Sequence, residues 1–264
     1  MLMAVKNQFK VTMLSIKYAL IREMLNKVTF ISNIVFMMLN NACFIIQWVI
    51  MFSLKDNIGN YAFKDVILLW GIASFTFGIS HFFFKKAFSL SDIINSGKLD
   101  AHIVQPKNIL LSVITSDVEV SSIGDIIYGY IMLFIYGISI KNILLFTFLG
   151  ICGALIIVSI AVMTGSLSFW LNRSDTIADS YNGMLLSFAT YPDSIFNSTV
   201  KIIFYTVIPI AFSNYLPVAV IRCFNLFEFI SIITVTILLI ILAFIVFYRG
   251  LKRYSSSNLM GSRI

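Results

Sequence analysis

Long apolar runs alternate with short polar connections along most of the chain. The clearest runs cover residues 30–54, 66–84, 123–140, 143–170 and 229–248. A transmembrane helix needs about 20 consecutive, mostly apolar residues, so each run predicts one crossing of a membrane. With 59% hydrophobic and 12% charged residues, the chain has more apolar surface than one soluble core could cover. The pattern therefore predicts an all-α integral membrane protein.

A sixth apolar region, residues 176–221, is interrupted by three prolines. We expect a fifth crossing over about 176–190 and then a re-entrant segment within 191–221 that dips back from the outer side, because a further full crossing would place the basic tail, 249–264, outside. Backbone that is not helical survives at membrane depth only inside protein or beside a cavity. A long helix kinked at proline is the alternative. The residues of this region assigned to a subunit interface or a pathway are Tyr191, Pro192, Pro209, Asn214 and Pro217.

The positive charges favour one orientation. The formal net charge is +7, but lysines and arginines flank the apolar runs instead of forming a soluble patch, so we expect no nucleic-acid partner. If the N-terminus is cytoplasmic and the chain crosses the membrane six times, few of the 19 Lys and Arg residues lie outside. Both termini and the polar connection 85–122 are therefore predicted to be cytoplasmic. The basic residues left outside are Lys55, Lys64, Lys141, Lys201 and Arg222.

Residues 1–27 have an amphipathic helical pattern. One face is mainly apolar, and three lysines lie away from its centre. This pattern is typical of a helix that lies in the inner membrane interface, with its basic groups toward the lipid headgroups. A plain cytosolic helix is the alternative. The residues on the apolar face are Val5, Phe9, Thr12, Ile16 and Leu20.

The predicted cytoplasmic connection contains signals for a short helix. Ser89 or Ser91 could cap a helix that runs through Asn95, and Gly97 is a stop signal. Pro106 then forces an extended or turning path. A short cytoplasmic helix held between two spans is a docking surface. An ordinary solvated loop is the alternative.

Ionisable groups are rare within the predicted spans. Asp125, His81 and Glu228 lie near span ends, where interfacial water makes a boundary role the simplest interpretation. The sequence has no HExxH motif, and "SGKLD" lacks the glycines and the Ser or Thr of a phosphate-binding loop. We therefore expect no intramembrane enzyme, no ATP hydrolysis, and no cofactor or metal bound by this chain.

Four amide side chains recur at heptad spacing in the first predicted span: Asn26, Asn33, Asn40 and Gln47. A helix drifts by only about 20° per heptad, so the four amides stay on one flank. Amides that face lipid are costly, and we expect this stripe to meet protein or a cavity. Chance alignment is the alternative.

Three stretches carry a family resemblance: "SGKLDAHIVQPKN" at 96–108, "YPDSIF" at 191–196 and "VIPIAFSNYLP" at 207–217. The chain resembles the membrane subunits of bacterial type-2 ATP-binding-cassette (ABC) exporters, in particular a six-span subgroup. Span order and loop lengths extend the resemblance over nearly the whole chain. Ile103 and Val104 stand where leucines are common in such subunits. The matching residues of the first stretch are Ser96, Gly97, Leu99, Asp100, Pro106 and Asn108.

The resemblance implies a coupling helix, between the second and third spans, that seats in a groove of a separate ATPase subunit. It also implies two copies of that ABC ATPase, which bind ATP and Mg, and a second permease subunit, identical or paralogous. The residues assigned to ATPase coupling are Leu90, Asp92, Ile93, Ser96, Gly97, Leu99, Asp100, Ile103 and Pro106.

Together these features predict one permease domain over residues 1–264, in a bacterial cytoplasmic membrane. It comprises six spans, an N-terminal interfacial helix, a cytoplasmic coupling helix and a re-entrant segment between spans five and six. Apolar walls with a few amides and hydroxyls, and no buried charge, favour a drug, a hydrophobic peptide or a lipid-like molecule as the substrate, and the family resemblance implies export. A non-transporting membrane sensor or assembly subunit is the first alternative, and an intramembrane enzyme the second.

Overall fold

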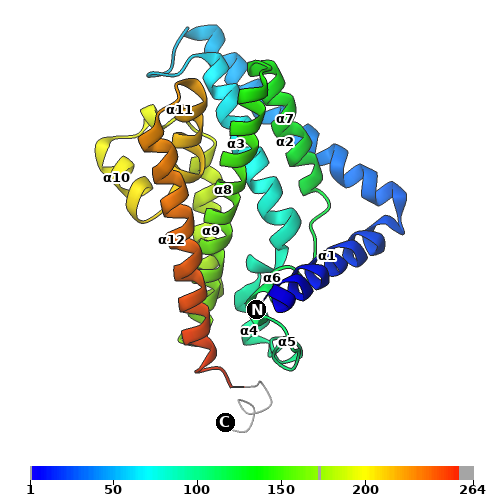
Figure 1. Cartoon of the computed structure of the whole chain (residues 1–264). Helices are drawn as coiled ribbons and strands as arrows, with labels where there is room; N and C mark the ends of the chain where they lie inside the picture. Colours follow the sequence, from blue (N-terminus) through cyan, green and yellow to red (C-terminus); the bar gives the residue numbers. More distant parts are fainter. Residues whose placement is uncertain (1, 172–173, 256–264) are drawn as a thin grey trace.

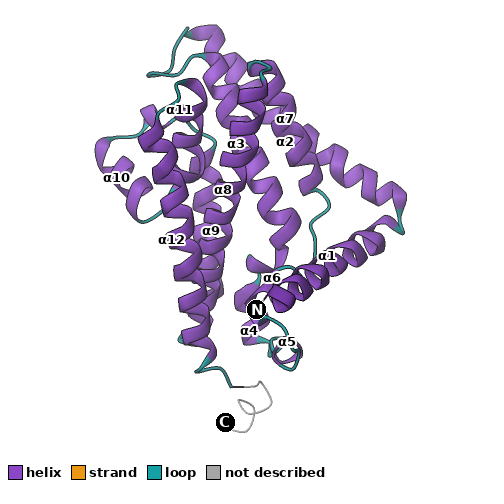
Figure 2. Ribbon diagram, viewed as in Figure 1, coloured by secondary structure: helices purple, strands orange, loops and turns teal. Residues whose placement is uncertain are grey.

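The structure is a computed structural model that describes residues 2–171 and 174–255. It is an all-helical bundle, and no strand occurs in the described part of the chain (Figures 1 and 2). Helix α1 begins and helix α12 ends at the same end of the bundle as α4 and α5 (Figure 1). In chain order the elements are α1 (Leu2–Met24), α2 (Lys27–Leu54), α3 (Phe63–Phe84), η1 (Lys85–Ala87), α4 (Leu90–Asn95), α5 (Asp100–Ile103), α6 (Ile109–Ile114), α7 (Ser122–Tyr136), α8 (Ile140–Ser166), η2 (Leu167–Phe169), α9 (Ser174–Ala189), η3 (Asp193–Ile195), α10 (Ser198–Thr206), η4 (Ala211–Tyr215), α11 (Leu216–Arg222) and α12 (Leu226–Leu251).

Four helices within the described residues are long and apolar enough to cross a membrane. They are α2, α3, α8 and α12, and the helical stretch of α3 continues through η1 and α4 to Asn95. Each of the four corresponds to one predicted run, so these four predictions are confirmed. The chain is thus a multi-pass membrane protein.

The third predicted run forms a shorter helix than expected. Helix α7 has 15 residues, a length of roughly 22 Å, and it ends at Tyr136 instead of continuing through Ile140. Gly137 ends the helix, and Ser139 has extended backbone before α8 begins at Ile140. The predicted boundary is therefore wrong, because a glycine near the end of an apolar run stops the helix without changing the hydrophobic pattern.

The proline-rich region forms α9, η3, α10, the π-helical turn η4 and α11. Helix α10 meets the η4–α11 stretch at an angle of 84°. Pro209 lies at this bend, where its ring and its missing N–H prevent a continuous α-helix. The bent pair counts as a fifth candidate span or as a re-entrant loop, while α9 has 16 residues and carries Asp175 and Asp179. Six crossings and the re-entrant path therefore stay predictions.

Both ends of the stretch from η3 to α11 contact the connection between α2 and α3. The Ser194 hydroxyl donates to the Ile58 carbonyl at 3.2 Å. The Arg222 guanidinium lies 3.0 Å from the Asp65 carboxylate and stacks over the Tyr61 ring, 5.4 Å from its centre. Residues 194 and 222 therefore lie at the same end of the bundle. We call the five contacting residues the clasp: Ile58, Tyr61, Asp65, Ser194 and Arg222.

Helix α1 starts near α4 at the base of the bundle and slants outward, away from the bundle axis (Figure 1). Ile16 and Ala19 are buried in a small cluster with Val118 and Val120. Thr12 and Leu20 of the predicted apolar face are half-buried, whereas Val5 and Phe9 have side chains outside the described part. A one-sided contact of this kind fits the predicted amphipathic helix, and its place in the membrane interface stays a prediction.

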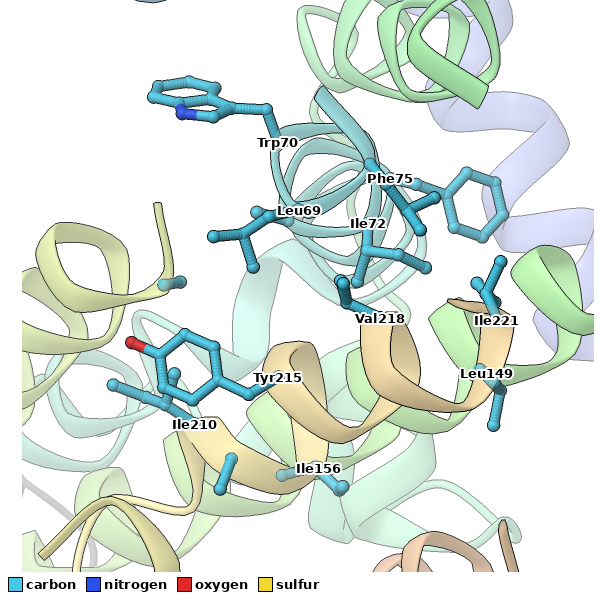
Figure 3. Close-up of a cluster of buried hydrophobic side chains, with 14 of the residues drawn as sticks. Leu69, Trp70, Ile72, Phe75, Leu149, Ile156, Ile210, Tyr215, Val218 and Ile221 are labelled. Carbon is cyan, nitrogen blue, oxygen red and sulfur yellow. The ribbon is translucent and has the colours of Figure 1, made fainter. Parts of the chain in front are cut away.

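Helices α3 and α8 form the centre of the bundle, with η4 and α11 packed between them (Figure 3). In the most apolar stretches of α3 and α8, 72% and 61% of the residues are buried. The corresponding shares are 11% for α2 and 17% for α12. Phe75 of α3 fits against Gly150 of α8, where an added Cβ would collide with the ring. Helices α2 and α12 consequently expose most of their apolar surface.

Candidate functional site

A cavity of about 630 Å³ lies between α2, α3 and α9. Trp70, Ser74, Phe77 and His81 line it from one face of α3, so it follows that helix for roughly 16 Å. A volume of this size is ordinary for a site that holds a drug-sized molecule. The cavity is therefore the candidate functional site.

A buried polar group lies on the cavity wall where α2, α3 and α7 meet. Asp125 of α7 is 9% exposed, and its carboxylate accepts a hydrogen bond from the Asn41 side-chain amide at 2.6 Å. The Ser74 hydroxyl donates to the Asp125 backbone carbonyl at 3.0 Å. Gly124 permits this packing, since a Cβ there would lie 2.5 Å from the Ile34 carbonyl oxygen. The predicted boundary role is wrong for Asp125, because close helix packing carries it into the bundle.

Aromatic side chains form another part of the wall. Phe44 stacks on Trp70 with ring centres 5.4 Å apart, and Trp48 meets Tyr191 edge-on at 5.7 Å. The indole N–H of Trp70 and the side-chain oxygen of Asn182 are buried with no hydrogen-bond partner in the described structure. Both residues line the cavity.

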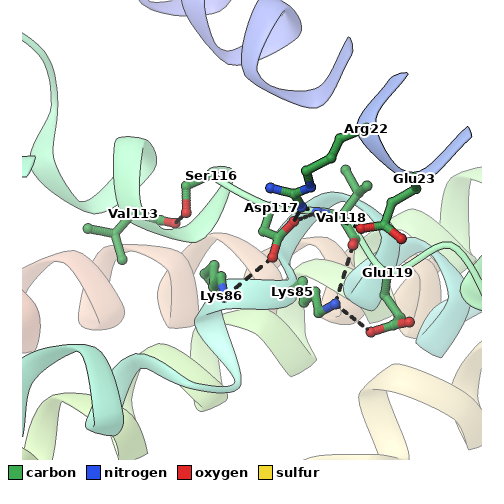
Figure 4. Close-up of polar contacts among 9 residues, drawn as sticks. All are labelled: Arg22, Glu23, Lys85, Lys86, Val113, Ser116, Asp117, Val118 and Glu119. Atoms are coloured by element: carbon green, nitrogen blue, oxygen red, sulfur yellow. Dashed lines mark hydrogen bonds and ion pairs between the residues drawn. The ribbon is translucent and has the colours of Figure 1, made fainter. Parts of the chain in front are cut away.

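The end of the cavity nearest α4 carries its remaining ionisable groups. His81 stacks on Phe88 with ring centres 3.9 Å apart, and Glu119 forms an ion pair with Lys85 at 2.9 Å. Beside this pair, Asp117 binds basic groups of η1 and α1, as Figure 4 shows. No group of three or more His, Cys, Asp or Glu residues that could hold a metal ion occurs within residues 2–171 and 174–255.

The amide stripe divides between two environments. Asn40 and Gln47 line the cavity, whereas Asn33 is exposed on α2 away from it. Asn26 is the N-cap of α2, and its side-chain oxygen accepts from the Thr29 N–H at 3.2 Å. The prediction of one helical stripe is wrong for Asn26, because the helix begins after it.

The residues assigned to the pathway after α9 also separate. Tyr191 lines the cavity. Pro192 is buried beside it in the chain, Pro209 lies at the bend, and Pro217 is buried in α11. Asn214 is fully buried in η4, and neither polar atom of its side chain has a partner among the described residues.

The connection between α3 and α7 folds into α4, α5 and α6. Leu90, Ile93 and Leu99 are buried in a cluster with Val113 of α6 and Phe247 of α12. These three assigned coupling residues therefore support the connection from inside and do not lie on its outer surface. The apolar spacing of a short loop helix does not tell which neighbour will cover it, and the assignment of these residues to ATPase coupling stays a prediction.

The outer surface of this connection is formed by other residues. Asp92, Ser96 and Pro106 are exposed, and Ile103 and Val104 at the end of α5 are 39% and 83% exposed. Val104 was not among the assigned residues, although it sits next to Ile103 in the stretch that carried the resemblance. We name these five residues the α4–α5 surface.

Glycine, serine and asparagine residues lie at the ends of the short helices in this connection. Gly97 has a φ of 73°, a conformation that glycine adopts without strain, and it ends α4 as predicted. Asp100 is half-buried in the first turn of α5. Ser89 occupies the N-cap position of α4 but makes no capping hydrogen bond with its side chain, so that part of the prediction is wrong. Asn108 caps α6, and its own N–H donates to the Gln8 side chain of α1 at 3.0 Å.

A bundle of membrane-spanning helices with a cavity along α3, and with a structured connection projecting from one end, fits a membrane transport protein. The family model of ABC-2 family transporter proteins matches residues 34–258, and the chain belongs to this family. It is accordingly a permease subunit of an ABC transporter, a membrane transport component and not itself an enzyme, and the family implies an ATPase partner. The comparisons with curated proteins and with solved structures returned no match.

Proposed function

We propose that this chain forms the translocation pathway of an ATP-driven exporter in a bacterial cytoplasmic membrane. The cavity carries the proposal, because it runs along α3 inside the bundle and ends beside the connection that we assign to the ATPase. Its aromatic walls with a few polar groups suit a drug, a hydrophobic peptide or a lipid-like molecule. The partner ATPase, in two copies, binds ATP and Mg, and a second permease subunit, identical or paralogous, completes the pathway.

The proposed topology has six crossings with both termini in the cytoplasm. The clasp supports a re-entrant path for the stretch after α9, because Ser194 and Arg222 contact the same connection, and a full crossing would place them at opposite ends. Helix α9 would then be the fifth crossing, and α1 would lie in the inner interface. Under this topology the α4–α5 surface faces the cytoplasm.

The α4–α5 surface supports the proposal of a docking site. Ile103 and Val104 are large apolar side chains exposed at its tip, and on the cytoplasmic side no lipid covers them. Exposed apolar groups of this kind, rimmed by polar residues such as Asp92 and Ser96, mark protein interaction sites. We propose that the two side chains insert into the groove of the ATPase subunit.

The experiment that tests this function is co-purification of the ATPase with an Ile103→Asp, Val104→Asp double variant. Both side chains are exposed, so the variant should insert and fold normally but lose most of the bound ATPase. The matched control is Ile138→Asp, since Ile138 is 71% exposed in the connection between α7 and α8. Full retention of the ATPase by the double variant would argue against docking at this surface.

A further inference from the structure

We infer that the cavity binds an organic cation with an apolar body, which names the substrate class of the proposed function and rests on it. The cationic centre pairs with the carboxylate of Asp125, and the apolar body lies against the aromatic wall. This goes beyond the expectation of a generally amphipathic substrate, because that expectation assumed walls without a buried charge.

The charge of the cavity supports this inference. Its described lining includes two carboxylates, Asp125 and Glu119, and one imidazole, His81, but no Lys or Arg. Glu119 already pairs with Lys85. Asp125 forms no salt bridge among the described residues, and its carboxylate receives a hydrogen bond from the neutral Asn41 amide. A carboxylate inside a membrane protein is costly unless a cation accompanies it. A cationic ligand would therefore supply the positive charge that the described residues do not place beside Asp125.

The aromatic wall supports an organic rather than an inorganic cation. Phe44, Trp48, Trp70, Phe77 and Tyr191 all line the same cavity as Asp125. Aromatic faces attract cations and bury apolar groups at the same time. A bare metal ion would use neither these faces nor a volume of about 630 Å³.

Two polar atoms of residues that line the cavity have no hydrogen-bond partner in the described structure. Trp70 is only 6% exposed, yet its indole N–H has no acceptor in the described structure. The side-chain oxygen of Asn182 likewise has no donor there. Buried polar groups normally find partners, and an acceptor and a donor on a bound molecule that reached these atoms would satisfy them.

The test compares two probes of matched size and opposite charge, tetraphenylphosphonium and tetraphenylborate. Each is equilibrated by dialysis against the purified full-length chain in detergent, with empty micelles as the blank. We expect saturable binding of tetraphenylphosphonium and at least about tenfold weaker binding of tetraphenylborate. Equal binding of the two ions, or uptake no greater than that of the micelles, would overturn the inference.

Variants separate a binding role of Asp125 from a structural one. Asp125→Asn keeps the shape and removes the charge, and it should weaken tetraphenylphosphonium binding at least about tenfold. Ser159→Ala is the control: it removes a buried hydroxyl of α8 that lies outside the described lining of the cavity and keeps the Asp125 carboxylate, so it should leave the affinity nearly unchanged. Unaltered binding by a folded Asp125→Asn protein would sink the assignment.

A second pair of variants covers the case in which Asp125→Asn does not fold. Gln47 lines the cavity but is exposed, so it tolerates a charge. Gln47→Glu should strengthen tetraphenylphosphonium binding several-fold, and Gln47→Lys should weaken it. Identical affinities for the two variants would contradict a cation in this cavity.

The binding experiment is independent of the ATPase. If the ATPase co-purifies but tetraphenylphosphonium does not bind, the substrate class is wrong and the permease assignment stands. If tetraphenylphosphonium binds and the ATPase is retained by the variant at Ile103 and Val104, the cavity is correct and the docking surface is wrong.

Discussion

Gly153 is a residue at which three elements, α8, η4 and α3, approach closely. A Cβ at this position would lie 2.6 Å from the Ser213 carbonyl oxygen of η4 and 3.1 Å from Thr76 of α3. A backbone oxygen in a packed turn cannot move aside without shifting the turn. Gly153 is thus the contact that lets the π-helical turn pass between α3 and α8.

We therefore expect Gly153→Ala to lower the free energy of unfolding by about 1–3 kcal/mol. Gly183→Ala in α9 is the matched control, since a Cβ there meets no atom within 4 Å. Removing a helical glycine should leave that variant unchanged or more stable by about 0.5–1 kcal/mol. Thermal unfolding in detergent measures both, and equal midpoints would show that the contact is not tight.

At the residue scale the sequence predicted some of the residues that line the cavity and missed Asp125. Asn40 and Gln47 could be predicted because polar residues stand out in an apolar run. Asp125 could not, since a carboxylate near the end of a run also fits a place in interfacial water. The available signal was Gly124 beside it, which indicates close helix packing but does not say against what.

Among the elements, α1 contacts the bundle through polar groups around Asp117 as well as through the apolar cluster of Ile16 and Ala19. The Asp117 carboxylate accepts from Arg22 at 2.6 Å and lies 3.4 Å from the Lys86 ammonium (Figure 4). Burial raises the pKa of Asp117, but the hydrogen bonds from Arg22 and from the Val118 N–H, with the nearby lysine charges, leave it below its usual range. Asp117 is therefore ionised in the folded chain at neutral pH.

The sign of the pH dependence follows from this lowered pKa. The contribution of Asp117 to holding α1 is complete above its unfolded pKa of 3.8 and is lost as the pH falls through the folded pKa. Arg22 is largely exposed, so the contact contributes only about 0.2–1 kcal/mol. Asp117→Asn should reproduce the acid effect at neutral pH, seen as faster hydrogen exchange in α1.

Glu23→Gln is the control for this experiment. Glu23 pairs with the same arginine at 3.5 Å, next to it on the helix surface, and does not reach η1 or the connection after α6. Its replacement should leave exchange in α1 unchanged. Equal acceleration in both variants would mean that charge alone, and not the contact with Asp117, governs α1.

Most elements followed from the hydrophobic pattern, and the exceptions have a common cause. The long runs became α2, α3, α8 and α12 because twenty apolar residues leave little choice of structure. Helices α7 and α9 and the π-helical turn η4 were not specified in this way. Their lengths depend on where glycine and proline end a helix and on how neighbouring helices pack against it. The packing of neighbours is a tertiary effect that the hydrophobic pattern does not contain.

On the scale of the whole molecule, α2 and α12 present different exposed surfaces. Both expose aliphatic side chains, but α2 also carries Asn33 away from the cavity. An amide facing lipid is costly, whereas an amide at a contact between two membrane proteins is satisfied. We therefore predict that the α2 surface around Asn33 contacts the proposed second permease subunit.

Asn33→Cys should crosslink to the neighbouring permease in membranes that contain the assembled transporter. Cys43 and Cys223 are exposed and must first be replaced. Leu238→Cys serves as the control, since Leu238 is 52% exposed on α12 and should face lipid. A crosslink at Leu238 but not at Asn33 would place the second subunit on the other side of the bundle.

The clasp also sets an order of events during synthesis. Ser194 and Ile58 are 136 residues apart, so at about 5–20 residues per second the ribosome adds Ser194 roughly 7–27 s after Ile58. Helices α2 and α3 can insert as a hairpin during this interval, while the connection between them waits uncovered. Closure over that connection is thus a late step of biogenesis, and a nascent chain arrested before Ser194 leaves the hairpin open to proteases on that side of the membrane.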